Sequence, residues 1–238
     1  MKSYKFFVFM LCLNLSACAS IYPEQKVVAS DPDNAGISRL AKSDINEVVE
    51  LHQRAVIQDL KLLMFKLYKR NPAGRHDKGK RNIKASVALF FSRPHDQYFS
   101  HWRQMDATDI IRVALDETYQ GSDRVLPYIF GLRKMMMASY DNHTEFFYFT
   151  SIDGQKLYNS ARNIEIAAWM LAENRDIKGN LLLLSDSLTS EQRNLSYQRL
   201  FGEMIATQDN LAEIIARKNG RLIKTVVVRA ASMMFLPI

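Results

Sequence analysis

Apolar residues recur at steps of three and four along a stretch that starts near residue 45, and this spacing constrains the fold most. Because an α-helix completes a turn about every 3.6 residues, side chains spaced in this way share one face. Ser43 and Asp44 suit the first turn of such a helix, and Asn71-Pro72-Ala73-Gly74 would end it. We therefore predict one amphipathic helix over residues 43–69. Its apolar positions include Ile45, Val48, Val49, His52, Val56, Leu60, Leu63, Met64 and Leu67.

Similar patterns predict further helices, and residues that break helices are scarce. The whole chain has nine glycines and six prolines, whereas a β sandwich needs a turn about every 8–12 residues. We predict an all-α fold, an irregular multi-helix bundle, in which the aromatic stretch 145–150 is a connector rather than a strand. The additional helices are expected over residues 106–120, 124–140, 155–174, 189–218 and 221–235.

Some residues in these helices could serve a ligand site but fit a helical core better. Met135-Met136-Met137 could bind copper, yet methionines on a helix more often fill irregular space in a core. His52 has no companion ligand nearby in sequence, so we expect a hydrogen-bonded core or boundary position. The apolar end of the chain, residues 233–238, is predicted to dock onto the core.

The helix over 155–174 carries polar residues around an apolar stripe. These residues could bind a ligand if they faced a cleft, and an exposed or inter-helix hydrogen-bond network is the simpler interpretation. They are Tyr158, Asn159, Arg162, Asn163 and Glu165.

The first twenty residues have the layout of a secretory signal. Lys2 and Lys5 precede an apolar run from Phe6 to Leu13, and small residues follow at Ser16 and Ala17. The run is interrupted by a polar residue before it reaches the roughly 20 apolar residues that a membrane-spanning helix needs. An uncleaved membrane anchor is therefore the weaker interpretation.

Leu15-Ser16-Ala17-Cys18 within this segment resembles the lipobox of bacterial lipoproteins. The resemblance implies that the signal is cut before Cys18, that diacylglycerol is linked to its sulfur, and that its new amino group is acylated. Several acyl chains make such an anchor effectively permanent. The implied organisation is a signal peptide over 1–17, a lipidated cysteine and flexible tether over 18–42, and a single helical domain over 43–238.

Cleavage after Ala17-Cys18-Ala19 is the alternative, and it would release a soluble periplasmic protein. Ala19 bears on the membrane to which a lipoprotein would be sorted. An aspartate at that position would resemble the signal that retains lipoproteins in the inner membrane. Alanine therefore favours an outer-membrane protein, with the domain on the periplasmic side.

The chain has two cysteines, and this location removes both from thiol chemistry. Cleavage removes Cys12, and lipidation occupies Cys18. Thiol catalysis, zinc–cysteine sites and disulfides are thus not expected. Loss of Lys2 and Lys5, with no acidic residue in the signal, lowers the formal net charge from +7 to +5. This mild basicity suits anionic lipid head groups or acidic polymers, although an ordinary solvated surface also explains it.

Residues 69–84 form the most basic segment, with one proline and two glycines that prevent a regular helix. A mobile basic loop could contact phosphates of lipid or lipopolysaccharide, and a solvated loop is an equal alternative. Nucleic acid is not expected, because no aromatic residues alternate with these charges. The candidate contacts with an anionic surface are Lys69, Arg70, Arg75, Lys78, Lys80, Arg81 and Lys84.

His95, Asp96 and His101 form the densest cluster of groups capable of acid–base or metal chemistry. The two histidines are six residues apart, so they match neither a zinc-binding helix nor a known hydrolase motif. We expect a polar, aromatic corner between helices, with no metal and no cofactor. These three residues remain the weak catalytic candidates.

The sequence supports one main functional hypothesis and two alternatives. The main hypothesis is a non-catalytic, lipid-anchored envelope protein that binds another protein, peptidoglycan or anionic lipid. One alternative is a periplasmic hydrolase or metal-dependent enzyme that uses the His95-Asp96-His101 cluster, with His143 or Glu145 brought near by folding. The other is a carrier of a small hydrophobic ligand, which would require a cavity between the helices.

Overall fold

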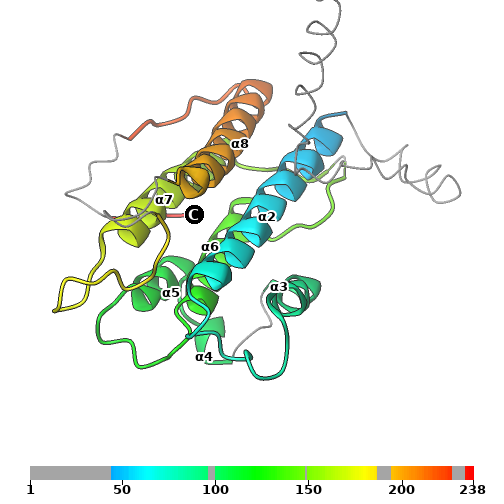
Figure 1. Cartoon of the computed structure of the whole chain (residues 1–238). Helices are drawn as coiled ribbons and strands as arrows, with labels where there is room; N and C mark the ends of the chain where they lie inside the picture. The colour runs from blue at the N-terminus through cyan, green and yellow to red at the C-terminus, as the bar shows by residue number, and fades with distance from the viewer. Residues whose placement is uncertain (1–43, 96–99, 148, 187–193, 227–233) are drawn as a thin grey trace, which may run out of the picture. The chain divides into compact units, whose positions relative to one another are not determined.

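Seven α-helices make up the regular structure of the residues that the computed structural model describes (Figure 1). Those residues are 44–95, 100–147, 149–186, 194–226 and 234–238. Within these ranges there is no β-strand, and one isolated bridge pairs Arg175 with Leu181. The prediction of an all-α fold is therefore confirmed. The helices are α2 (Asp44–Arg70), α3 (Ile83–Ser92), α4 (Ser100–Arg103), α5 (Ala107–Ala114), α6 (Val125–Ser139), α7 (Gly154–Glu173) and α8 (Ser196–Lys218).

Helix α6 is buried on all sides. It packs against α2, α5 and α7, and of its residues only Lys134 and Ala138 are not buried. The sequence predicted this helix over residues 124–140, close to its observed bounds. Met135, Met136 and Met137 are all buried, which confirms that they fill the core. A helix that is covered all round must satisfy every polar group it carries within the protein.

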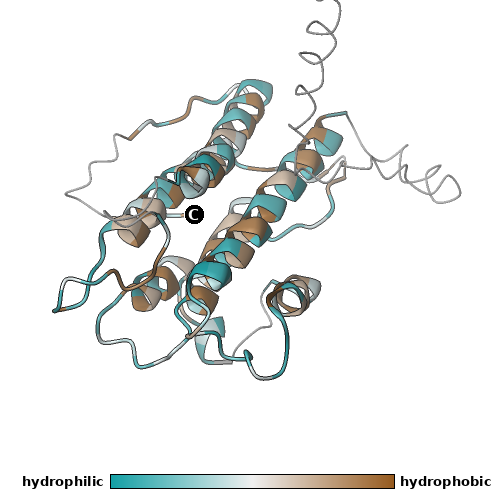
Figure 2. Ribbon diagram, in the orientation of Figure 1, coloured by the Kyte–Doolittle hydropathy of each residue, from teal (hydrophilic) through white to brown (hydrophobic). Residues whose placement is uncertain are grey.

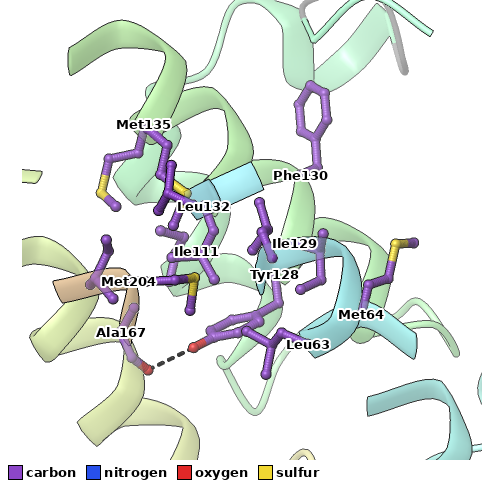
Figure 3. Close-up of a cluster of buried hydrophobic side chains, with 14 of the residues drawn as sticks. Leu63, Met64, Ile111, Tyr128, Ile129, Phe130, Leu132, Met135, Ala167 and Met204 are labelled. Atoms are coloured by element: carbon purple, nitrogen blue, oxygen red, sulfur yellow. Dashed lines mark hydrogen bonds between the residues drawn. The ribbon is translucent and has the colours of Figure 1, made fainter. Parts of the chain in front are cut away.

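The long helices α2 and α8 pack against each other, and α7 packs along α8. Both α2 and α8 mix hydrophobic and hydrophilic residues, as helices with one buried side do (Figure 2). Between the helices, the Tyr128 hydroxyl of α6 donates a hydrogen bond to the Ala167 carbonyl of α7 at 3.0 Å (Figure 3). The core is thus apolar, with individual polar groups that find partners across helix contacts.

Gln208 of α8 is the centre of a buried polar network. Its side-chain oxygen accepts a hydrogen bond from the Tyr140 hydroxyl at 2.9 Å. Its amide nitrogen donates to Ser160 Oγ at 3.1 Å and to Ser139 Oγ at 3.3 Å. Gln208, Ser139, Ser160 and Tyr140 all have essentially no exposed surface. The network therefore fixes α6, α7 and α8 in one register, because leaving any one of these buried groups unpaired would lower the free energy of unfolding by about 1–3 kcal/mol.

Three predicted helices differ from the observed structure. The helix expected over 106–120 ends at Ala114, where the Arg124 side chain donates hydrogen bonds to the carbonyls of Ala114 and Asp116. The helix expected over 221–235 is wrong for residues 221–226 and 234–235, which have no regular secondary structure, and residues 227–233 lie outside the described residues. The one expected over 189–218 begins at Ser196, and residues 187–193 lie outside the described residues.

Helices α5 and α6 approach closely at Gly131. A Cβ atom at this position would lie 2.7 Å from both the Ala107 carbonyl oxygen and Ile111 Cγ1. Gly202 of α8 is the opposite case, because it is exposed and a Cβ there would meet no atom within 4 Å. A substitution at Gly131 therefore reports on helix packing, whereas the same substitution at Gly202 reports on helix propensity alone.

We predict that Gly131→Ala destabilises the fold by about 1–3 kcal/mol, because the methyl group forces α5 away from α6. Gly202→Ala should instead stabilise it by about 0.5–1 kcal/mol, because alanine has the higher helix propensity. Urea denaturation of both variants measures the two changes. A change of the same sign in both variants would contradict the close contact at Gly131.

Asp59 of α2 is half-buried beside α8. Burial raises the pKa of its carboxyl to about 6, the Glu203 carboxylate adds to the rise, and Arg199 opposes it. Because the ordinary value is 3.8, the folded state binds more protons than the unfolded state between the two values. The free energy of unfolding therefore falls as the pH rises from about 4 to about 6.

We expect Asp59→Asn to stabilise the protein at pH 7 and to leave its stability at pH 4 nearly unchanged. The gain should be on the order of 1 kcal/mol once the partial exposure of the carboxyl is allowed for. Denaturation curves at pH 4, 5, 6 and 7 test it, with Glu117→Gln on an exposed loop as the control. If the free energy of unfolding changes with pH in the same way in Asp59→Asn and in the wild type, the ionised Asp59 does not destabilise the fold and the prediction is wrong.

Candidate functional site

The basic segment 69–84 is folded around a buried ion pair. Arg75 is 7% exposed and Asp77 is 5% exposed, with 3.4 Å between guanidinium and carboxylate. Arg75 also donates to Ser86 Oγ at 2.6 Å and to the Arg81 carbonyl at 2.5 Å. Arg75 is therefore a structural residue and is removed from the predicted anionic-surface contacts. The exposed members of that set are Lys69, Lys78, Lys80, Arg81 and Lys84, and Arg70 is half-buried.

Asp123 and His76 form a contact that the sequence did not predict. The Asp123 carboxylate lies 2.7 Å from His76 Nδ1 and accepts hydrogen bonds from the Tyr68 hydroxyl and from the backbone N–H of His76 and Leu126. The bond from Leu126 satisfies a backbone N–H in the first turn of α6. Because this one carboxylate joins α2, the basic segment and α6, its role is structural. The sequence gave no signal for this role of His76, because the residue lies among lysines and arginines that form a basic segment.

The predicted catalytic candidates are not brought together in the described part of the chain. His95 Nε2 lies 3.0 Å from the side-chain oxygen of Asn142, and the exposed His101 ring packs against Trp102 with 4.5 Å between centroids. Asp96 lies outside the described residues. Across the described ranges, no three His, Cys, Asp or Glu side chains are grouped as metal ligands.

His143 and Glu145, the two supporting candidates, are likewise not part of a group of metal ligands among the described residues. The His143 ring is 6.1 Å from that of Phe146, centroid to centroid, and its carbonyl accepts a hydrogen bond from Gln53. Glu145 is exposed. His52 is half-buried, with Nδ1 2.8 Å from the Val48 carbonyl, as expected for a boundary histidine.

His95 does line a cavity of about 670 Å³ beside α6, which we call the α6 cavity. Its walls come from α2, from the end of α3 and the residues after it, from α6, and from the turn that follows α6. The cavity is open to solvent, and most of the residues that line it are polar or charged. The lining residues are Glu50, Gln53, Arg54, Ile57, Ser92, Arg93, Pro94, His95, Arg133, Met137, Asn142 and Thr144.

Arg133 is the buried cation of the α6 cavity. It is 9% exposed, and its two terminal nitrogens donate to the carbonyls of Phe90 and Arg93 at 3.0 and 2.9 Å. Its Nε–H is buried with no acceptor. The guanidinium carbon lies 5.4 Å from the Phe90 ring centroid and 5.1 Å from that of Phe91. Burial lowers the pKa of Arg133, although a guanidinium still remains charged at neutral pH.

The α6 cavity has an excess of positive charge. Arg54, Arg93 and Arg133 line it together with Glu50, a formal charge of +2 when His95 is neutral. One Glu50 oxygen accepts a hydrogen bond from the Phe146 backbone N–H at 3.1 Å. Within the described residues, no carboxylate lies within ion-pair distance of Arg133. The geometry therefore suits an anionic ligand.

The polar face of α7 is covered by the C-terminal residues of the chain. Asn163 donates to the Leu236 carbonyl at 2.8 Å and accepts from the Leu236 backbone N–H at 2.6 Å. Phe235 and Ile238 pack against the core, which confirms the docked end of the chain over 234–238. The expected hydrogen-bond network thus exists. The tail is the partner of Asn163, and Asp209 of α8 is the partner of Arg162, which donates to its carboxylate at 2.5 Å. The further pairs are Gln155 with Lys224, Tyr158 with Val226, and Asn159 with Pro237.

No protein-family model, curated protein or solved structure matches the chain. No helix in the described ranges is long and apolar enough to cross a bilayer. The predicted signal peptide, Cys18 and the tether lie outside the described residues. The site is therefore interpreted from its own geometry.

We predict that Asn163→Ala destabilises the fold by about 1–3 kcal/mol, because it leaves both backbone groups of Leu236 without their partner. Gln104→Ala, at an exposed position, is the control and should change stability by less than about 0.5 kcal/mol. Thermal unfolding of the two variants measures the difference, and limited proteolysis reports release of the tail. Equal stabilities of Asn163→Ala and the wild type would show that the tail contact is not needed.

Proposed function

We propose that the protein is a bacterial lipoprotein of the outer membrane, held on the periplasmic side, whose helical domain binds an envelope component without catalysis. Leu15-Ser16-Ala17-Cys18, at the end of a short signal segment, supports the anchor. Cys18 would carry the diacylglycerol, and residues 19–42 would be the tether.

The observation that carries the binding role is the open, cationic α6 cavity. Its polar lining consists mainly of arginines, amides and hydroxyls, which recognise a ligand by charge and hydrogen bonds. Its histidine faces the amide of Asn142, whereas an acid–base catalyst would face a carboxylate or a nucleophile. These features favour binding over hydrolysis.

The cavity also bears on the nature of the bound component. A carrier of a small hydrophobic molecule would need an apolar lining, and the α6 cavity contains three arginines and one glutamate. Anionic lipid, or an envelope component that carries a negatively charged group, matches this lining better. We therefore propose an anionic partner in the envelope, and no nucleic acid.

Cys18→Ser is the variant that tests the anchor. We expect fatty-acid label on the wild type to be lost in Cys18→Ser, and the mature variant to leave the outer-membrane fraction, because three acyl chains hold the wild type there. Cys12→Ser is the matched control and should keep both label and location, since this cysteine is removed with the signal. Radiolabelled palmitate and membrane fractionation provide the two measurements.

Label that persists on Cys18→Ser would refute the acylation site. A wild-type protein that is unlabelled and begins after Ala19 would show ordinary signal cleavage and a soluble periplasmic protein.

A further inference from the structure

We propose that the α6 cavity binds the phosphate group of a phosphomonoester, with Arg133 as its buried cation and Arg54 and Arg93 as its outer ones. This inference rests on the proposed binding role and names the class of ligand for the same cavity. The phosphate could belong to a lipid head group or to a small soluble ester, since both present the same dianion.

The first step is that the positive charge of Arg133 is not balanced by an anionic group within the described structure. A charged group this deeply buried normally has an ionised partner, because loss of hydration is only partly offset by carbonyl groups. Here the guanidinium donates to two carbonyls, from Phe90 and Arg93, and its Nε–H has no acceptor. The Arg133 side chain lines the cavity, so an anion placed there would supply the missing charge.

The second step is that Arg133 is held in place before any ligand arrives. Phe90 and Phe91 both lie against its guanidinium, and their rings are almost perpendicular to each other, at 78°. With the two carbonyl contacts, these rings restrict the side chain to one position. A preorganised arginine loses less conformational entropy when it binds an oxyanion, which strengthens binding.

The third step is the match of charge. The described residues that line the α6 cavity carry a formal charge of +2, from three arginines and Glu50. A phosphomonoester carries about −1.5 to −2 at pH 7, whereas a single carboxylate carries −1. The dianion neutralises the cavity, and a carboxylate would leave it with a net positive charge. Arginine also binds phosphate oxygens through paired N–H groups.

The fourth step is the room beside the phosphate. A cavity of about 670 Å³ exceeds what a phosphate ion fills, and Ile57, Pro94 and Met137 give part of its wall an apolar surface. Asn142 and Thr144 add hydrogen-bonding groups at the rim. An organic group esterified to the phosphate would contact these residues. The cavity is therefore better suited to a phosphate ester than to free phosphate.

The binding test uses the full-length chain purified in detergent and titrated calorimetrically with glycerol 3-phosphate, inorganic phosphate and succinate. We expect saturable binding of glycerol 3-phosphate and weaker binding of inorganic phosphate. Succinate also carries −2 at pH 7 but divides it between two separate carboxylates, so it should bind less tightly than glycerol 3-phosphate. Arg54→Ala should weaken glycerol 3-phosphate binding several-fold, and Arg133→Met by about tenfold or more, because each removes a charged hydrogen-bond donor. Lys61→Ala removes an exposed cation of α2 outside the cavity, and its affinity should equal that of the wild type.

A second arm separates the two sources of phosphate. Full-length Cys18→Ser is mixed with vesicles of phosphatidylcholine with or without phosphatidate, which carries a phosphomonoester head group. A lipid ligand predicts binding that depends on phosphatidate, is competed by glycerol 3-phosphate and is lost in the Arg54→Ala background. A soluble ester predicts equal binding to both vesicles, alongside the calorimetric signal.

Several results would overturn the inference. These are no saturable binding of either phosphate compound, equal affinities for Arg54→Ala and wild type, or succinate binding as tight as that of glycerol 3-phosphate. Arg54 is exposed, so its variant decides the question even if Arg133→Met does not fold, which circular dichroism would reveal. Calorimetry reports ligand binding alone, and the vesicle arm uses the Cys18→Ser variant, so a negative result in either leaves the acylation of Cys18 to its own test.

Discussion

The enclosure of α6 on all sides is the constraint on which the rest of the structure depends. A helix with so little surface toward water leaves few of its polar side chains hydrated, so most of them need a partner elsewhere in the protein. The Tyr128 hydroxyl does so at the Ala167 carbonyl, and Ser139 does so through Gln208. Arg133 is the exception, because its hydrogen-bond partners are neutral carbonyls and no carboxylate among the described residues balances its charge. The same burial that organises the core therefore creates the cationic wall of the α6 cavity.

The two ends of α6 show how local chemistry positions that cavity. Asp123 caps the first turn and also ties down the basic segment through His76, so the start of the helix is fixed from two directions. At the other end, Asp141 and Asn142 have φ angles of +52° and +62°, in the left-handed region that asparagine and aspartate tolerate best. This turn lets the Asn142 N–H bond to the Met137 carbonyl and places its side chain next to His95. The rim of the cavity thus depends on how the buried helix ends.

The sequence predicted what depends on neighbours within a few turns and missed what depends on distant partners. The periods of three and four found α2 and α7 almost to the residue, because one side of each helix remains wet. Residues 221–226 were assigned to a helix, because nothing in Thr225-Val226 indicates that Tyr158, far back in the chain, binds the Val226 backbone. Such backbone groups are paired with side chains, so they do not need the bonds of a helix.

The candidate site was only partly predictable for the same reason. In sequence, Arg133 and Lys134 are adjacent cations on one helix and look alike. In the structure, Arg133 is buried beside Phe90 and Phe91, whereas the half-buried Lys134 donates to the carbonyls of Arg103 and Met105. His95 was singled out as part of a catalytic cluster and instead lines a cavity assembled from four segments. A local pattern identified the residue, but only the fold showed which groups surround it.

An open cavity with a few charged groups binds its ligand weakly in solution. The proposed anchor would raise the occupancy of such a weak site by holding the domain near ligands at the membrane surface. A flexible tether of about 25 residues has a typical end-to-end distance of roughly 25–30 Å, so an anchored domain would stay within reach of the membrane surface. Confinement of that kind raises the effective concentration of a surface ligand to about the millimolar range. A phosphate site of only millimolar affinity would then be substantially occupied at a phosphate-rich surface, and nearly empty for the same ligand at micromolar concentration in solution. The openness of the α6 cavity, which would be a defect in a soluble receptor, is therefore compatible with the function of a tethered one.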